Sequence, residues 1–239
     1  MNETISIRQI SKRFKEKTVL NTIDLTMQEG SIYGFIGPSG AGKTTLVKMI
    51  VGMEKPDSGS ISVLNQAVPN FSLLQEIGYM AQSDALYPEL TGKENLTFFA
   101  SLYQLSKTEM KERITYAARL VNLTDQLSKK VSAYSGGMKR RLSLAIALIQ
   151  NPKILILDEP TVGIDPELRQ SIWQELIQLK EAGKTIIVTT HVMDEAERCD
   201  YIAMIRDGAI ITRGTPAELK EQYHATSFDE VFLNAGREK

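Results

Sequence analysis

The sequence has little cysteine and no long hydrophobic run. Its one cysteine, Cys199, cannot form a disulfide within the chain, and the first ten residues, MNETISIRQI, lack the apolar centre of a signal peptide. We therefore expect a reducing, cytoplasmic environment. The longest apolar stretches, 144–149 and 154–157, are far shorter than the ~20 residues that cross a bilayer. We expect that the chain moves no solute by itself.

A strong net charge is also missing. The 28 Lys and Arg residues nearly balance the 29 Asp and Glu residues, which leaves a formal charge of -1. This balance gives no general attraction to nucleic acid or anionic lipid, so we expect no nucleic-acid partner. Hydrophobic residues make up 42% of the 239 positions, which is enough for a globular core.

The first part of the chain predicts strands followed by a helix. Apolar and polar residues alternate with a period of two over much of 5–36, and 31–36 reads as a buried strand. A glycine-rich loop follows, and 45–51 predicts a helix that ends at Gly52. We expect an N-terminal antiparallel β subdomain that leads into a strand, a loop and a helix.

The middle of the chain predicts helices. Strand signals vanish between about Tyr87 and Gln150, and two capping boxes, Thr91 with Glu94 and Ser106 with Glu109, each open a helical pattern. These signals predict an α-helical subdomain inserted into an α/β protein. The expected domains are 1–86 with 151–239 as the α/β core and 87–150 as the helical insertion.

The last part returns to strands and helices in alternation. It predicts a strand over 154–157, a helix from Asp165-Pro166 to about Gly183, a strand over 185–190 and a helix from Thr215. Such alternation is typical of a mostly parallel sheet. The predicted fold class is therefore α/β.

A phosphate-binding motif lies between the first buried strand and the first helix. It has the form G-x-x-x-x-G-K-[ST], and its members are Gly37, Pro38, Ser39, Gly40, Ala41, Gly42, Lys43 and Thr44. Backbone N–H groups of such a loop surround phosphate oxygens, Lys43 reaches the β- and γ-phosphates, and the Thr44 hydroxyl can bind Mg²⁺. The flanking strand and helix disfavour a chance glycine turn. The P-loop NTPase core predicted here binds a nucleoside triphosphate.

Two carboxylates follow the strand over 154–157. Asp158 and Glu159 lie at the carboxyl edge of the predicted sheet, where ligands of open α/β folds bind. Asp158 is placed to hold Mg²⁺ through its water shell, and Glu159 to polarise a water for attack on the γ-phosphate. His191 follows the next strand in the same way and would orient that water. The alternative is that the two acids only cap the next turn.

The segment Tyr134-Ser135-Gly136-Gly137-Met138 precedes Asp158 by about twenty residues and resembles the LSGGQ signature of ABC transporter ATP-binding subunits. Gln82, Gly163-Ile164-Asp165-Pro166 and His191 match other family motifs in the family order. The resemblance implies an ATPase that uses ATP and Mg²⁺. It also implies a head-to-tail dimer with a second copy or a similar subunit, in which each ATP lies between the phosphate loop of one subunit and the signature of the other.

The resemblance assigns roles to single residues. Phe14 would stack on adenine, unless it is a core residue, and Asp165 would lie at the dimer interface. Local chemistry is consistent with the signature role, because Ser135 can cap a helix that begins at Gly136 and Gly137, whose N–H groups would face the partner's ATP. The alternative is an ordinary capped helix start.

The nucleotide-binding residues that the resemblance implies are Phe14, Gly37 to Thr44, Thr45 and Gln82. The implied Mg²⁺ ligands are Thr44, Gln82 and Asp158. The implied catalytic residues are Lys43, Glu159 and His191. Tyr134 and Met138 stand where the family's signature usually has Leu and Gln. We therefore do not assume that this chain matches the hydrolysis rate of a subunit that has Gln at the second of these positions.

Other segments resemble the bacterial exporter branch that handles drugs, antibiotics, lipids or polysaccharides; they are 86–96, 98–103, 134–139 and 227–233. This resemblance implies export through a separate membrane permease, which residues 82–103 would face from the inner side of the cell membrane. An importer ATPase shares every catalytic residue and stays an alternative. A soluble ABC protein acting on ribosomes or DNA is disfavoured because the chain has one cassette and no long coiled-coil insertion, and a GTPase because the Asn-Lys-x-Asp motif is missing.

Two remaining groups are interpreted without a binding role. Lys139-Arg140-Arg141, near the start of a predicted helix, reads as solvated charge or local positive potential beside ATP. Phe98, Phe99, Leu102 and Tyr103 read mostly as core or as packing between subdomains.

Overall fold

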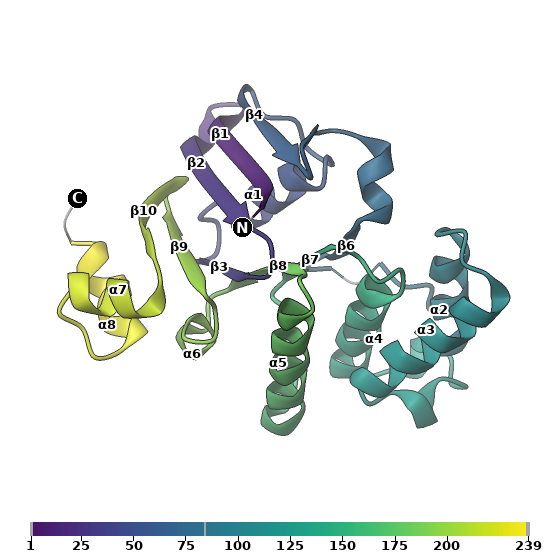
Figure 1. The fold of residues 1–239 in the computed structure, drawn as a ribbon. Helices are drawn as coiled ribbons and strands as arrows, with labels where there is room; N and C mark the ends of the chain where they lie inside the picture. The colour runs from purple at the N-terminus through teal and green to yellow at the C-terminus, as the bar shows by residue number, and fades with distance from the viewer. Residues whose placement is uncertain (1, 84, 238–239) are drawn as a thin grey trace. The chain divides into compact units, whose positions relative to one another are not determined.

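The computed structural model describes residues 2–83 and 85–237 (Figure 1). The described residues form two compact units, one within 1–71 and 185–239 and the other within 72–184. The predicted α/β class is confirmed, with one antiparallel sheet and mostly parallel pairing elsewhere, where β9 and β10 form the antiparallel exception. The helices predicted within 87–150 share the second unit with two strands and the long helix that follows them.

The first unit contains the antiparallel sheet and four further strands. The antiparallel sheet has the order β2-β1-β4-β5, where β1 is Glu3–Phe14, β2 Lys17–Gln28, β4 Ser58–Val63 and β5 Gln66–Ala67. The other strands are β3 (Ile32–Ile36), β8 (Thr185–Thr190), β9 (Tyr201–Arg206) and β10 (Ala209–Gly214). β3 lies parallel to both β8 and β9 and is buried along its whole length, as expected for a central strand.

Four helices complete the first unit: α1 (Lys43–Ile50), α6 (Met193–Ala196), α7 (Pro216–Gln222) and α8 (Phe228–Ala235). α1 begins two residues before the predicted start because Gly42, in a left-handed conformation, directly precedes Lys43 and ends the loop there. The predicted helix at Thr215 is confirmed, with a complete capping box to Glu218.

The second unit carries β6 (Ile77–Met80) and β7 (Ile154–Asp158) in parallel, together with four helices. The helices are α2 (Gly92–Ser101), α3 (Lys107–Leu120), α4 (Gly136–Leu148) and α5 (Pro166–Glu181), and short 3-10 turns cover Phe71–Gln75, Thr124–Gln126 and Val131–Ala133. Both predicted capping boxes, at Thr91 and Ser106, are confirmed. Among the helices of residues 2–83 and 85–237, none is long and apolar enough to span a membrane.

Candidate functional site

The predicted phosphate loop connects β3 with α1 in the first unit. Gly42 has a φ of 108°, and a side chain there would place its Cβ atom 2.7 Å from the Val19 carbonyl oxygen, so the position requires glycine. The buried Lys43 donates from Nζ to the carbonyl oxygens of Gly37, at 2.6 Å, and Pro38, at 3.0 Å. The loop therefore curls around an ammonium group beside the first turn of α1, whose N–H groups lack acceptors within the helix. This arrangement suits phosphate.

His191 lies at the same sheet edge as the phosphate loop. β3 and β8 are parallel, and Ile36 is opposite Thr190, so Gly37 and His191 each follow the last residue of neighbouring strands. The histidine is exposed. Its contact with a γ-phosphate stays a prediction, but the register brings it to the loop.

Phe14 ends β1 with 45% of its surface exposed, which excludes the core interpretation of this residue. The Nζ atom of Lys12 lies 5.0 Å from the ring centroid. An exposed aromatic ring of this kind offers a flat apolar face to a nucleotide base.

The acidic residues lie at one sheet edge in the second unit. β6 and β7 are parallel with Met80 opposite Leu157, so the segments that carry Gln82, Asp158 and Glu159 leave the sheet side by side. Asp158 is 1% exposed, whereas Glu159 is half-buried and Gln82 exposed.

The residues predicted to bind Mg²⁺ offer a hydroxyl, an amide oxygen and a carboxylate, from Thr44, Gln82 and Asp158. Mg²⁺ prefers such oxygen ligands and keeps several waters, so the donor set fits this ion. Burial, with a smaller effect of the Asp158 charge, raises the pKa of Tyr79 to about 12. A phenol is neutral at pH 7 even at its ordinary pKa, so the shift reflects the buried surroundings beside Asp158 and does not change the protonation state.

The signature segment forms a capped helix start. The Ser135 hydroxyl accepts a hydrogen bond from the Met138 N–H at 3.3 Å, as predicted, and α4 begins at Gly136. Gly136 is exposed, and a Cβ atom built on it would have no neighbour within 4 Å. Asp165, also exposed, caps α5 by accepting from the Leu168 N–H at 2.9 Å. The helix start of the signature is thus open to a group from outside the unit.

Tyr134, one of the two departures from the family signature, is explained by its surroundings. It is buried, and its hydroxyl donates to the Gln126 carbonyl at 2.8 Å. Gly92 makes room for the ring, because a Cβ atom there would collide with the tyrosine hydroxyl. Tyr134 therefore anchors the segment before Ser135 from inside the unit.

The interpretation of Arg140 as solvated charge is wrong. Arg140 is only 7% exposed, and its guanidinium donates to the backbone carbonyls of Ala81, Gln82, Asp158 and Glu159. A run of three basic residues gave no sign of this, because the acceptors are distant in sequence.

The interpretation of the aromatic segment as core is also wrong for two of its members. Phe98 is 40% and Leu102 58% exposed, and Tyr87 packs edge-on against Phe98 with ring centroids 4.8 Å apart. These residues form an aromatic and aliphatic surface on and beside α2. Asp84, which belongs to the predicted permease-facing segment, lies outside the described residues.

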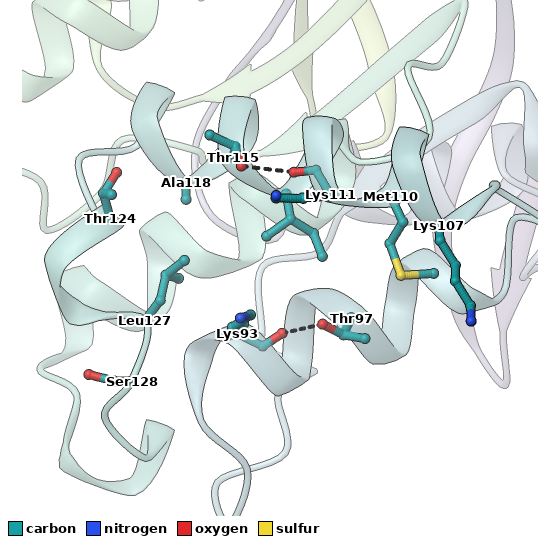
Figure 2. Close-up of a pocket in the computed structure, with 11 residues that line it drawn as sticks. Lys93, Thr97, Lys107, Met110, Lys111, Thr115, Ala118, Thr124, Leu127 and Ser128 are labelled. Carbon is teal, nitrogen blue, oxygen red and sulfur yellow. Dashed lines mark hydrogen bonds between the residues drawn. The ribbon is translucent and has the colours of Figure 1, made fainter.

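A pocket of about 560 Å³ lies between α2 and α3 (Figure 2). Lys93 comes from α2, Lys107 and Lys111 come from α3, and apolar lining includes Ile114 and Leu127. Of the described residues that line the pocket, three are lysines and none is acidic. Among the described residues, the lining includes none of those predicted to bind the nucleotide.

The family model and the similar proteins that match this chain point to the same family. A family model described as ABC transporter matches residues 20–162. The Nod factor export ATP-binding protein I of Burkholderia lata is 41% identical over 231 residues, which are 95% of this chain and 76% of that protein. The protein of the same name from Rhizobium sp. (strain N33) matches with the same identity and coverage.

Solved structures agree. An ATP-binding subunit of an ABC transporter matches with a TM-score of 0.90 and 28% identity, over 98% of this chain and 99% of that one. The dimeric ATP-binding cassette MJ0796, in a post-hydrolysis state with ADP and Pi, matches with a TM-score of 0.82 and 27% identity, over 88% and 98%. The fold of this chain therefore occurs in proteins described as ATP-binding cassettes.

Proposed function

The chain belongs to the ABC transporter family, and we propose that it is the ATP-hydrolysing subunit of an exporter whose membrane permease is a separate protein. The observation that carries this proposal is the 41% identity, over 95% of the chain, to an export ATP-binding protein. Similarity of this extent favours export over import and over an action on ribosomes or DNA.

The proposed ATP site is assigned residue by residue. The phosphate loop, Gly37 to Thr45, binds the phosphates, and Phe14 stacks on adenine. Mg²⁺, held by Thr44, Gln82 and Asp158, would neutralise phosphate charge. Glu159 accepts a proton from the attacking water, and His191 orients that water. The positive, N–H-rich loop and the all-oxygen donor set support this assignment.

A second copy of the chain, or a similar subunit, is proposed to complete each site. The support is the open helix start at Gly136, capped by Ser135 and exposed, together with the exposed Asp165. An uncovered helix N-terminus favours an anionic group, and a γ-phosphate from a partner subunit would supply one.

The membrane permease is proposed to contact residues 82–103. Support comes from the exposed Tyr87, Phe98 and Leu102, since large exposed apolar side chains gathered on one surface mark interaction sites. Lys93, which belongs to the same segment, also lines the pocket between α2 and α3 shown in Figure 2. Through this contact the chain would lie on the inner face of the cell membrane.

The proposal is tested by purifying the tagged full chain from membranes in mild detergent. An integral membrane protein is expected to accompany it, and ATP should be hydrolysed by the preparation. Recovery of ribosomes without any membrane protein would instead support the soluble class and overturn the proposal.

Replacing Leu102 by Asp is expected to release the permease. A charge placed among apolar contacts at an interface costs several kcal/mol, so recovery of the membrane protein should fall by about tenfold or more. ATP hydrolysis by the isolated chain should change less than about twofold, because surface substitutions away from a site have small effects. The measurement is quantitative recovery of the membrane protein with the tagged chain.

Leu233→Asp is the matched control. Leu233 is also 58% exposed, but it lies on α8 in the first unit. Normal permease recovery with Leu102→Asp, or an equal loss with Leu233→Asp, would contradict the assignment of residues 82–103 as the contact.

A further inference from the structure

Arg140 uses every donor of its guanidinium on backbone carbonyls. Nε donates to Glu159 at 3.2 Å, and Nη1 donates to Ala81 at 2.8 Å and Gln82 at 2.9 Å. Nη2 donates to Glu159 at 2.8 Å and also to Asp158. An arginine has five N–H donors in a rigid fork, and these five bonds match them. The buried side chain therefore acts as a directed set of donors.

The carbonyl groups belong to the ends of two neighbouring strands. Ala81 and Gln82 directly follow β6, while Asp158 ends β7 and Glu159 follows it. Backbone carbonyls that leave a sheet need another donor when they are buried. One side chain from α4 provides that donor for both strands.

α4 is close enough to β6 to make this link rigid. A Cβ atom at Gly78 of β6 would collide with the Ala147 carbonyl oxygen of α4, so the two backbones pack with no side chain between them. The helix that starts at the signature and the two strand ends are thus held as one body.

Glu159 has an unusual backbone conformation that Arg140 helps to hold. Its φ is 55°, in the left-handed region, which costs about 1–2 kcal/mol for a residue with a side chain. Pro160, the next residue, disfavours the right-handed helical alternative. Two of the guanidinium bonds end on the Glu159 carbonyl and fix the orientation of its peptide group, and so the backbone from which the carboxylate extends.

We infer that Arg140 is a positioning residue for ATP hydrolysis, which acts through Glu159 by holding the backbone that carries its carboxylate. This inference rests on the proposed role of Glu159. Lysine at this position has three donors on one atom, and glutamine has two, so neither replaces the five-donor fork.

The test is the kinetics of Arg140→Lys in the full chain. We expect kcat for ATP to fall by about 10- to 100-fold, the scale of a misplaced catalytic group, while KM for ATP stays within about threefold. The control is Arg141→Lys on the same helix. Arg141 donates to the carbonyls of Val121, at 3.4 Å, and Asn122, at 3.1 Å. We expect the kcat of Arg141→Lys to lie within about twofold of the wild-type value.

A double-mutant cycle with Glu159→Gln separates positioning from general destabilisation. If Arg140 acts through Glu159, the double variant Arg140→Lys/Glu159→Gln should hydrolyse ATP in a single turnover at a rate within about twofold of that of Glu159→Gln alone. Independent, multiplying effects, or an unchanged kcat in Arg140→Lys alone, would overturn the inference.

The outcome for Glu159→Gln alone judges the proposed function separately. Near-normal turnover in that variant would mean that the base is assigned wrongly, whatever Arg140 does. If Arg140→Lys does not bind ATP, Arg140→Gln is measured in the same way. If neither variant binds ATP, Arg140 is a folding determinant and the positioning role is wrong.

Discussion

Glu159→Gln is expected to lower ATP turnover by about 10²- to 10⁴-fold, the usual contribution of a general base. Glutamine keeps the size of the side chain but cannot take a proton from water. Glu159 is half-buried at the end of β7, and Arg140 donates to its carbonyl, so the substitution should leave the backbone in place. Affinity for ATP should stay within about threefold, because the lost group acts on the attacking water. Phosphate release measured at saturating ATP gives the comparison.

The same variant tests the closing dimer. If hydrolysis reopens the dimer, Glu159→Gln should accumulate as a dimer with ATP and Mg²⁺ on a sizing column, whereas wild type should not. Glu167→Gln, an exposed acid in the first turn of α5, is the matched control and should behave as wild type in both assays. Near-normal turnover in Glu159→Gln would remove Glu159 from the role of base, and a persistent monomer would argue against closure by ATP.

Much of the fold could be predicted because its determinants are local. The capping boxes at Thr91 and Ser106 each involve residues three apart, and both form as expected. The strand over 185–190 was predicted with its bounds, since a buried central strand is a short apolar run between turn formers. Local chemistry likewise predicted the Ser135 cap and the start of α4.

The hairpin of β9 and β10 was not predicted, although its signal is visible afterwards. An apolar run, Ile202 to Ile205, precedes Asp207-Gly208, a dipeptide typical of tight hairpin turns. β9 pairs with β3, which lies far away in the sequence. Pairing between strands distant in sequence depends on the whole sheet, so the residues of one strand predict it only weakly.

Arg140 shows where reasoning from one segment fails at the site itself. In the sequence it is the middle of three basic residues, a pattern typical of solvated charge. Its surroundings come from carbonyls at 81–82 and 158–159, which α4 meets only in the folded unit. The phosphate loop needed no such information, because its eight residues are consecutive and α1 begins within them, at Lys43.

Lys43→Ala is expected to weaken ATP binding by about 10- to 100-fold, since a hydrogen bond to a charged group contributes ~1.5–3 kcal/mol. Hydrolysis should fall further than binding, because the ammonium also stabilises charge that develops on the γ-phosphate in the transition state. Equilibrium binding of a fluorescent ATP analogue and phosphate release at saturating ATP measure the two effects. Lys48→Ala, an exposed lysine in the last turn of α1, is the matched control and should bind ATP normally.

A comparison of nucleotides separates the two contributions of Lys43 to the loop. Besides reaching phosphate, Nζ bonds the carbonyls of Gly37 and Pro38, so its loss also removes links within the loop. If contact with the β- and γ-phosphates dominates, Lys43→Ala should weaken ATP strongly and AMP less than about twofold, because AMP lacks both groups. Equal losses for ATP and AMP would mean that the loop has lost its shape. Unchanged ATP binding would contradict the phosphate role of Lys43 altogether.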